Sequence, residues 1–315
     1  QISPKGITNS FSRPRKPQTQ PGPGTMIAKI LPAYSAALAG GTPPGERAEL
    51  LGMIETFQQA RGAGMLPSPA RISAEIFYNR ADIFRTAFRA YLLLGFLLLV
   101  VATNSNTRRK KALLQTTSKR RRWLPRLLTV LIVAVFLWQC AGLGLRWYIS
   151  GRAPWTNAYE SMVYVGWTTV LAGLIFARRS QLALALATLM GGVILFVSNL
   201  NWLDPQITPL VPVLKSYWLM IHVSVITASY GFFGIAAVTG LASLIAMIAG
   251  RPRHDLRIIG ELSMLIGLVL LAAGIFLGAV WANESWGRYW GWDPKETWAL
   301  ITLLVYTFVT HSRHI

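Results

Sequence analysis

A tryptophan-rich segment near the end of the chain is its most distinctive chemical feature. Five of the 12 tryptophans fall within the 18 residues Trp281–Trp298, which read WANESWGRYWGWDPKETW. The segment lies between two apolar runs, so we predict that it forms a loop at a membrane surface. A belt of interfacial aromatic residues needs only one or two tryptophans per helix end, whereas five of them interleaved with charged side chains make a broad aromatic surface.

Such a surface suits a large planar ligand with an anionic edge. The alternative is an ordinary aromatic belt, against which the spacing W-x4-W-x3-W-x-W argues because it crowds the rings into one loop. The candidate ligand-binding residues in this segment are Trp281, Trp286, Trp290, Trp292, Asp293 and Trp298.

Two of the four histidines lie at membrane depth and are candidate metal ligands. His222 lies about one turn inside one end of an apolar run, and His311 lies near the far end of the last run. An ionisable residue inside a membrane is costly and usually faces a partner or a cavity. A neutral imidazole bonded to a neighbouring helix is the alternative for each. His254 and His314 lie in or beside basic stretches, where we expect solvated side chains.

The two candidate ligands differ too much in depth to bind one iron. Trp298 marks one membrane surface, and His311 follows it by 13 residues, which is about 20 Å at the helical rise of ~1.5 Å per residue. His222 lies close to the first surface. If both histidines bind iron, there are two sites at two depths, and each needs a second histidine that this sequence does not supply.

Two basic residues in other loops on the side of the tryptophans are candidates for pairing with anionic carboxylates. Arg152 lies in the loop 148–160, and Lys215 lies in the loop 200–217. Either these loops form walls of the same pocket as the tryptophans, or they are ordinary interfacial turns.

The composition indicates a membrane protein. Hydrophobic residues make up 53% of the chain and charged residues 14%, and the mean hydropathy is +0.41. The net charge of +19 indicates cytoplasmic loops that follow the positive-inside rule, not a nucleic-acid partner. Cys140 is the single cysteine, which excludes an internal disulfide or a cysteine-based metal cluster. The sequence contains no C-x-x-C-H, so the chain is not itself a c-type cytochrome.

The apolar runs predict an all-α, polytopic membrane protein with about seven transmembrane helices, preceded by a short irregular and helical extramembrane region. Residues 1–25 are typical of a flexible linker, and residues 45–64 have helical spacing. Loops on one side of the membrane carry 13 basic residues against 4 on the other, which places the tryptophans outside the cytoplasm. The predicted spans are 84–103, 124–147, 161–177, 181–199, 218–249, 259–281 and 298–312.

The tryptophan-rich segment resembles a known family. WGRYWGWDPKETWALIT is similar to the WWD signature of the haem-handling proteins of cytochrome c assembly, and within that group the chain resembles the CcsA (ResC) family over about residues 120–315. SGRAPWTNAYESM, SYWLMIHVSVITASYGFF and VTHSR are similar to segments of that family and occur in the same order. AEIFYNRADIF resembles the junction of fused CcsB–CcsA proteins, in which a ResB-like half comes first.

The resemblance implies three parts and a longer protein. Residues 1–82 are expected to end the ResB-like half as a periplasmic linker with short helices, 83–123 to form a junction helix and basic loop, and 124–315 to form the CcsA-like haem-handling domain. The chain starts without Met and stops just after an apolar run, so we expect a fragment of a fused cytochrome c synthase.

The resemblance also implies roles for single residues. Haem b is the expected substrate and ligand. His222 matches the first of two external histidines that bind its iron, and His311 matches a ligand of an inner transmembrane haem. The signature residues that cradle the external haem match Trp286, Trp290, Trp292 and Asp293. The second external histidine is expected after Ile315, and the partner of His311 in the missing N-terminal half.

The implied function is delivery of haem to apocytochrome c, whose C-x-x-C-H thiols form thioethers with the vinyl groups. The expected partners are this apocytochrome, a fused or associated ResB/CcsB half, thiol-reducing periplasmic proteins and membrane lipid, without nucleic acid. The expected location is the bacterial inner membrane, with the haem site facing the periplasm. The sequence shows no evident general acid or base. Two alternatives remain open: a b-type haem electron-transfer subunit, and an exporter of a planar anionic molecule.

Overall fold

The computed structural model describes residues 23–40, 43–62, 66–111, 123–200, 202–208 and 216–312. The chain divides into two compact units, residues 1–69 and 70–315. Lys215, His314 and most of the predicted linker 1–25 lie outside the described residues. The functional division at residues 82 and 123 stays a prediction.

In the first unit, two helices pack against each other: α1 (Pro23–Ala39) and α2 (Pro44–Gly62). The helical spacing over 45–64 therefore corresponds to α2. None of the residues of α2 is buried, so this helix contributes no core of its own.

The second unit contains the rest of the described helices, and its described residues include no strand. The prediction of an all-α, polytopic membrane protein is confirmed. Each of the seven predicted runs coincides with one of the helices from α4 onward. The helices are α3 (Pro69–Ala81), α4 (Ile83–Lys111), α5 (Trp123–Ser150), α6 (Ala158–Phe176), α7 (Gln181–Ser198), α8 (Tyr217–Ile248), α9 (His254–Trp286) and α10 (Pro294–His311).

Five helical stretches among the described residues are long and apolar enough to cross a membrane. They comprise α3 with α4, and then α5, α7, α8 and α9. The chain is therefore a multi-pass membrane protein. The helices α6 and α10 lie beside these five stretches but are not among them. The predicted total of about seven transmembrane helices therefore stays a prediction.

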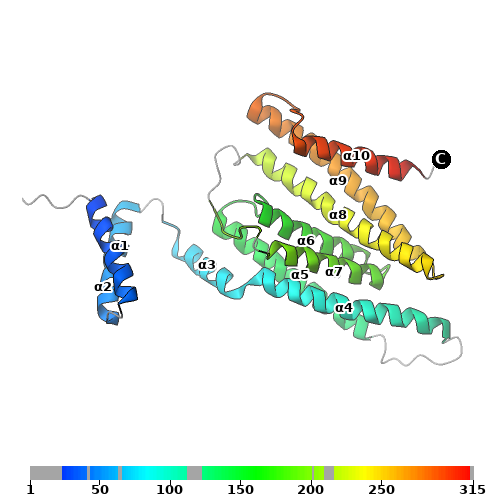
Figure 1. The fold of residues 1–315 in the computed structure, drawn as a ribbon, viewed down its shortest axis with the longest axis horizontal. Helices are drawn as coiled ribbons and strands as arrows, with labels where there is room; N and C mark the ends of the chain where they lie inside the picture. The colour runs from blue at the N-terminus through cyan, green and yellow to red at the C-terminus, as the bar shows by residue number, and fades with distance from the viewer. Residues whose placement is uncertain are drawn as a thin grey trace, which may run out of the picture. The chain divides into compact units, whose positions relative to one another are not determined.

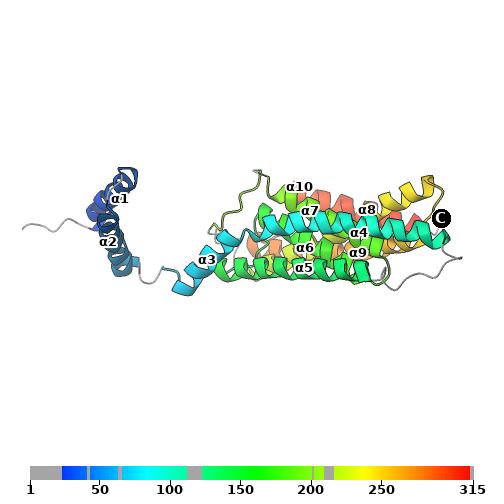
Figure 2. The same cartoon turned by 90° about the horizontal axis from the view of Figure 1, so that it is seen from below.

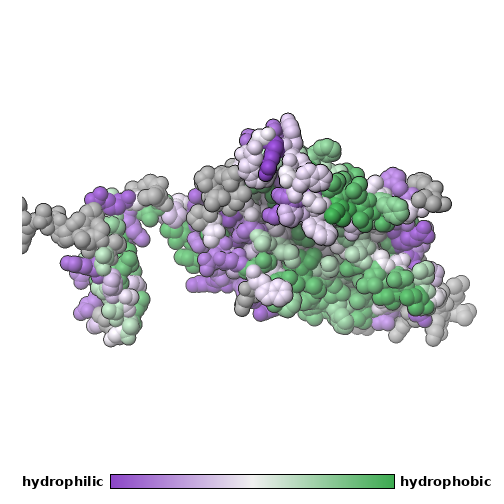
Figure 3. All heavy atoms as spheres, turned by 45° about the horizontal axis from the view of Figure 1, so that its top comes forward, coloured by the Kyte–Doolittle hydropathy of each residue, from purple (hydrophilic) through white to green (hydrophobic). Residues whose placement is uncertain are grey.

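Helices α4 to α10 run side by side (Figures 1 and 2). The most extensive pairing joins α8 to α9, while α4 packs on α5 and α7, α6 on α7 and α8, and α10 on α9. The face seen in Figure 3 is hydrophobic over the middle of these helices and hydrophilic toward their ends, as expected for a bundle surrounded by lipid.

Polar side chains also hold the bundle together inside. The hydroxyl of Tyr91 in α4 donates to Gln139 Oε1 in α5 over 2.9 Å, and Gln139 Nε2 donates to the Val163 carbonyl in α6 over 3.2 Å. Hydrogen bonds between helices are a common stabilising contact where lipid surrounds the protein. This chain of bonds fixes α4, α5 and α6 relative to one another.

Because successive helices alternate in direction, the connections 151–157 and 287–293 and the described residues 202–208 all lie at the end of the bundle opposite the α6–α7 and α8–α9 connections. We call this the tryptophan end. The joint between α3 and α4 also lies there, at Asp82, whose φ of 42° is left-handed. Aspartate tolerates that conformation better than most residues.

Candidate functional site

A pocket of about 130 Å³ lies at the tryptophan end, between α8, α9 and the start of α10. It contains His222 on α8 and the tryptophan side chains of the last turns of α9 and of the connection that follows. The predicted site residues that line it are His222, Trp281, Trp286, Trp290 and Asp293. Tertiary packing thus brings His222 of α8 together with the tryptophan-rich segment, which lies on α9 and the connection that follows it.

The orientation of the His222 ring is set by α9. Its Nδ1 lies 2.7 Å from the Gly274 carbonyl oxygen. Because a carbonyl oxygen only accepts, Nδ1 must carry the proton and donate it. The unprotonated nitrogen is then Nε2, which is the arrangement that a metal-binding imidazole needs.

A glycine makes room for this ring. A Cβ atom added at Gly278 would lie 2.6 Å from His222 Cε1 and 2.8 Å from Nδ1, well inside normal contact distance. The sequence Gly274-Ile-Phe-Leu-Gly278 is a G-x-x-x-G pattern, which lets membrane helices approach closely. Here the first glycine provides the carbonyl and the second provides the space.

Two tryptophans of the pocket have unused hydrogen-bond donors. Among the described residues, the indole Nε1 atoms of Trp281 and Trp290 are buried without a partner. Most buried polar groups in folded proteins are paired. Two unpaired donors beside one pocket favour a ligand with acceptor atoms at its edge. The Trp281 ring meets that of Trp286 edge to face at 4.7 Å between centroids.

The tryptophan-rich segment is less of a loop than we predicted. Helix α9 continues to Trp286 and α10 begins at Pro294, so only residues 287–293 connect helices. The prediction of an 18-residue loop is wrong because the segment contains helix-ending and helix-starting signals. Gly287, with a φ of 71°, ends α9, as glycine does in many helices.

The start of α10 is built by a capping box. Asp293 Oδ1 accepts from the Glu296 amide over 2.8 Å, and Glu296 Oε2 accepts from the amides of Asp293 (3.3 Å) and Gly291 (2.7 Å). Pro294 occupies the first helical position, where its missing N–H costs nothing. Asp293 therefore shapes the pocket wall by starting the helix that follows.

Two of the predicted tryptophans do not line this pocket. Trp292, whose φ is 57°, is 70% exposed, and Trp298 is 67% exposed. The Trp292 ring meets the ring of the lining residue Trp290 edge to face, at 5.7 Å between centroids, so it lies beside the pocket.

His311 lies at the other end of α10 from Asp293. Its Nδ1 is 2.8 Å from the Thr307 carbonyl oxygen, so the same tautomer argument leaves Nε2 unprotonated. His311 does not line the pocket that contains His222, in agreement with the difference in depth expected from the sequence.

Of the two basic residues that we predicted as carboxylate partners, Arg152 does not line the pocket. Arg152 Nη1 pairs with Glu160 Oε2 at 3.0 Å, and its Nη2 donates to the Thr208 carbonyl over 3.3 Å. Lys215 lies outside the described residues. Lys295, at the start of α10, does line the pocket and is a candidate cation.

The buried ion cluster around Glu160 was not foreseen from the sequence. Glu160 Oε1 accepts from Arg146 Nε over 2.8 Å, and both side chains are at most 1% exposed. Arg146 Nη1 also donates to the Tyr78 hydroxyl and to the Pro205 carbonyl. The cluster therefore ties α3, α5, α6 and the α7–α8 connection together. The local signal was available, because Asn157 and Glu160 form an N-x-x-E capping box.

The cluster reaches α8 through a tryptophan. Trp155, in the α5–α6 connection, donates its indole N–H to the Met220 carbonyl over 2.9 Å, two residues before His222. The connections at the tryptophan end are thus fastened to the first turn of the helix that carries the histidine.

Comparison with known proteins assigns the chain to a family. The family model described as cytochrome C assembly protein matches residues 155–315, which include α6 to α10 and the whole pocket. The chain belongs to the cytochrome c assembly protein family. This confirms the resemblance to CcsA-type proteins.

Three relatives of this CcsA-type chain illustrate the similarity. The protein NrfI of Wolinella succinogenes is 45% identical over 275 residues, which cover 84% of this chain and 29% of NrfI. The CcsA protein of Guillardia theta is 36% identical over 54% of this chain and 67% of its own length. The CcsA protein of Synechococcus strain CC9605 is 37% identical over 59% of this chain and 74% of its own length. The chain thus spans less than a third of NrfI.

Proposed function

We propose that this CcsA-type chain binds haem b as a substrate at the tryptophan end and presents it to apocytochrome c for thioether formation. Membership of the cytochrome c assembly family supports a role in cytochrome c biogenesis. The observation that carries the finer proposal is the convergence of His222 with the tryptophan-rich segment in one pocket.

In this proposal, His222 binds the haem iron through Nε2. The Gly274 carbonyl holds the ring by its Nδ1–H, which fixes the tautomer and makes the ligand more basic. A second imidazole would come from the longer protein. Two neutral imidazoles keep the iron low-spin and slow its reaction with oxygen.

The indole groups recognise the rest of the macrocycle. The unpaired N–H groups of Trp281 and Trp290 and the ammonium group of Lys295 are suited to haem propionates. The pocket of about 130 Å³ encloses only part of a ligand of this size, since sites for whole small molecules span ~300–1,000 Å³. The remainder would lie over the exposed rings of Trp292 and Trp298.

The chemistry at the vinyl groups is an addition. Each thiol of the C-x-x-C-H segment adds its sulfur to one vinyl carbon and its hydrogen to the other, so the thioether forms without net oxidation or reduction. The protein contributes by holding the vinyl edge toward the incoming peptide. The histidine of the peptide would take the place of one of the two imidazoles on the iron, and the product would leave when the other imidazole dissociates.

We further propose that haem reaches this pocket from a second site at the level of His311, near the opposite end of α10. The ligand opposite His311, and the ResB/CcsB half itself, would come from the longer protein. We also propose that the tryptophan end faces the periplasm of a bacterial inner membrane, since the positive-inside rule supports this orientation.

The visible spectrum of the reduced, full-length protein tests the external site. We expect a bis-imidazole spectrum that is lost in His222→Gly and restored by added imidazole. His254→Gly is the matched control, because His254 is exposed at the start of α9. Normal cytochrome c assembly by His222→Gly without imidazole would refute the proposal and favour an exporter that needs no metal ligand.

A further inference from the structure

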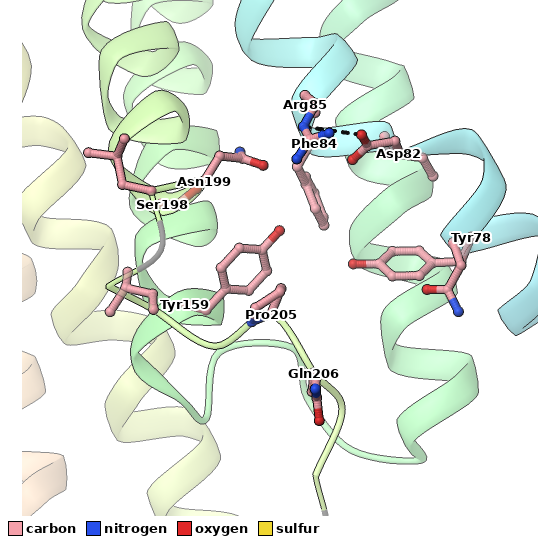
Figure 4. A pocket seen from close by; sticks show the side chains of 13 residues that line it. Tyr78, Asp82, Phe84, Arg85, Tyr159, Ser198, Asn199, Pro205 and Gln206 are labelled. Carbon is pink, nitrogen blue, oxygen red and sulfur yellow. Dashed lines mark ion pairs between the residues drawn. The ribbon is translucent and has the colours of Figure 1, made fainter.

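A second and larger pocket, of about 310 Å³, also opens at the tryptophan end and has no role in the proposed haem site. It is formed by the joint between α3 and α4, the start of α6, the end of α7 and the connection that follows. Figure 4 shows the Asp82–Arg85 pair on one side of this space and Asn199, Tyr159 and Pro205 on the other sides.

The pocket lies where the headgroups of a bilayer would be. Its wall includes Ile83, Phe84 and Arg85, the first residues of α4. About three turns further along α4, the side chains of Leu93 and Phe96 are exposed on a helix apolar enough to cross a membrane. A lipid whose chains lie against this part of α4 would have its headgroup at the height of the pocket.

Charged side chains of both signs lie at the pocket. Arg85 and Asp82 line its wall and pair with each other, and Arg146 donates to the carbonyl of Gln206, another lining residue. The carboxylate of Asp204 accepts from the Gln206 amide, so an anionic ligand is favoured by the donor groups that face the pocket and not by an excess of charge. The Arg146 side chain is 1% exposed, and a charge buried in this way is poorly screened by solvent.

Arg85 has donors left for a ligand. Its Nε lies 3.2 Å from Asp82 Oδ2, and the guanidinium carries two further, terminal nitrogens that can donate. A guanidinium presents these N–H groups as a fork that matches the oxygens of a phosphate group.

Two tyrosine hydroxyls complete the donor set. The Tyr159 ring is buried, with the Arg146 guanidinium 5.2 Å from its centroid. Its hydroxyl makes no hydrogen bond to the described residues and is directed into the pocket (Figure 4). The Tyr78 hydroxyl accepts from Arg146 Nη1 over 3.1 Å, which leaves its own proton free to donate.

We propose that this pocket binds an anionic phosphodiester, presented by the headgroup of a membrane phospholipid. Arg85 holds the phosphate oxygens, and the hydroxyls of Tyr159 and Tyr78 donate to them. The bound headgroup would fasten the α3–α4 joint to the ends of α6 and α7. This proposal does not depend on haem binding.

Lipid titration of the purified full-length protein, followed by native mass spectrometry, tests the site. We expect saturable binding of phosphatidylglycerol, a monoanionic phosphodiester, and at least about tenfold weaker binding of zwitterionic phosphatidylethanolamine. Arg85→Gln should weaken phosphatidylglycerol binding about tenfold, the effect of losing a charge-assisted hydrogen bond. Tyr159→Phe should weaken it a few-fold. Arg89→Gln, one turn further along α4 and outside the pocket, should leave it within about twofold of the unmodified protein.

Competition with inorganic phosphate distinguishes a lipid from a soluble source. Failure of millimolar phosphate to displace phosphatidylglycerol assigns the site to the lipid, whereas displacement shows the same phosphate chemistry with a soluble ligand and overturns the lipid assignment. Equal losses in Arg85→Gln and Arg89→Gln would overturn the site, because they would reveal general attraction to the membrane surface. If the unmodified protein shows no saturable binding of phosphatidylglycerol, the proposal of a lipid site is also overturned.

Discussion

Replacement of Gly278 by alanine tests how closely the haem site depends on helix packing. The added methyl group would lie 2.6 Å from His222 Cε1. Ordinary contact between such atoms begins at 3.4 Å, so the imidazole must retreat by about 0.8 Å. A retreat of that size in the direction away from α9 stretches the 2.7 Å bond from Nδ1 to the Gly274 carbonyl to a length that is no longer a hydrogen bond.

The expected cost has two parts. Overpacking at a close helix contact destabilises the fold by about 1–3 kcal/mol. Loss of the carbonyl that orients a metal-binding histidine lowers metal affinity by about 10–100-fold. We therefore expect Gly278→Ala to keep its fold but to bind haem at least tenfold more weakly, with a weakened bis-imidazole absorption in the reduced protein.

Gly240→Ala is the matched control for Gly278→Ala. Like Gly278, Gly240 lies eight residues before the end of a long helix, α8, but a Cβ there would meet nothing within 4 Å. Its replacement should leave haem affinity unchanged and could stabilise the helix by up to ~1 kcal/mol. Both variants would be titrated with haem and melted in the same detergent. Unchanged haem affinity in Gly278→Ala would show that His222 is not the ligand or that its ring is not held by α9.

Three further substitutions test other parts of the structure. Glu160→Gln leaves two nearly buried guanidiniums without a counter-charge, so we expect thermal melts to show a loss of about 3–5 kcal/mol of stability. Arg257→Gln is the control, because it breaks an exposed ion pair and should change the stability by less than about 1 kcal/mol. Trp290→Phe keeps an aromatic ring but removes a buried N–H, so haem affinity should fall about two- to tenfold. An equal fall in Trp298→Phe, whose ring is exposed, would contradict a role for the buried donor. Asp293→Ala removes the cap of α10 and should cost about 1 kcal/mol, most of which Asp293→Ser should recover; equal stability of the two variants would contradict the capping role.

The sequence by itself determined the helices and the family. Apolar runs of membrane length report the hydrophobic effect directly, because each residue in such a run must avoid water regardless of its neighbours in space. The runs therefore coincide with helices α4 to α10. The tryptophan-rich segment carries its family resemblance in adjacent residues, so no tertiary information was needed to find it. The capping boxes at Asn157 and Asp293 are equally local, and they correct the length of the predicted loop.

Only the tertiary structure decided which side chains meet. A helix sequence indicates which residues are apolar but not which neighbour each one faces, since packing depends on how two surfaces fit together. That fit placed His222 against Gly274 and Gly278. It also directed Arg152 to Glu160. A buried carboxylate needs a counter-charge close by, and Arg152 and Arg146 provide it there, so Arg152 was not available to the pocket that contains the tryptophans.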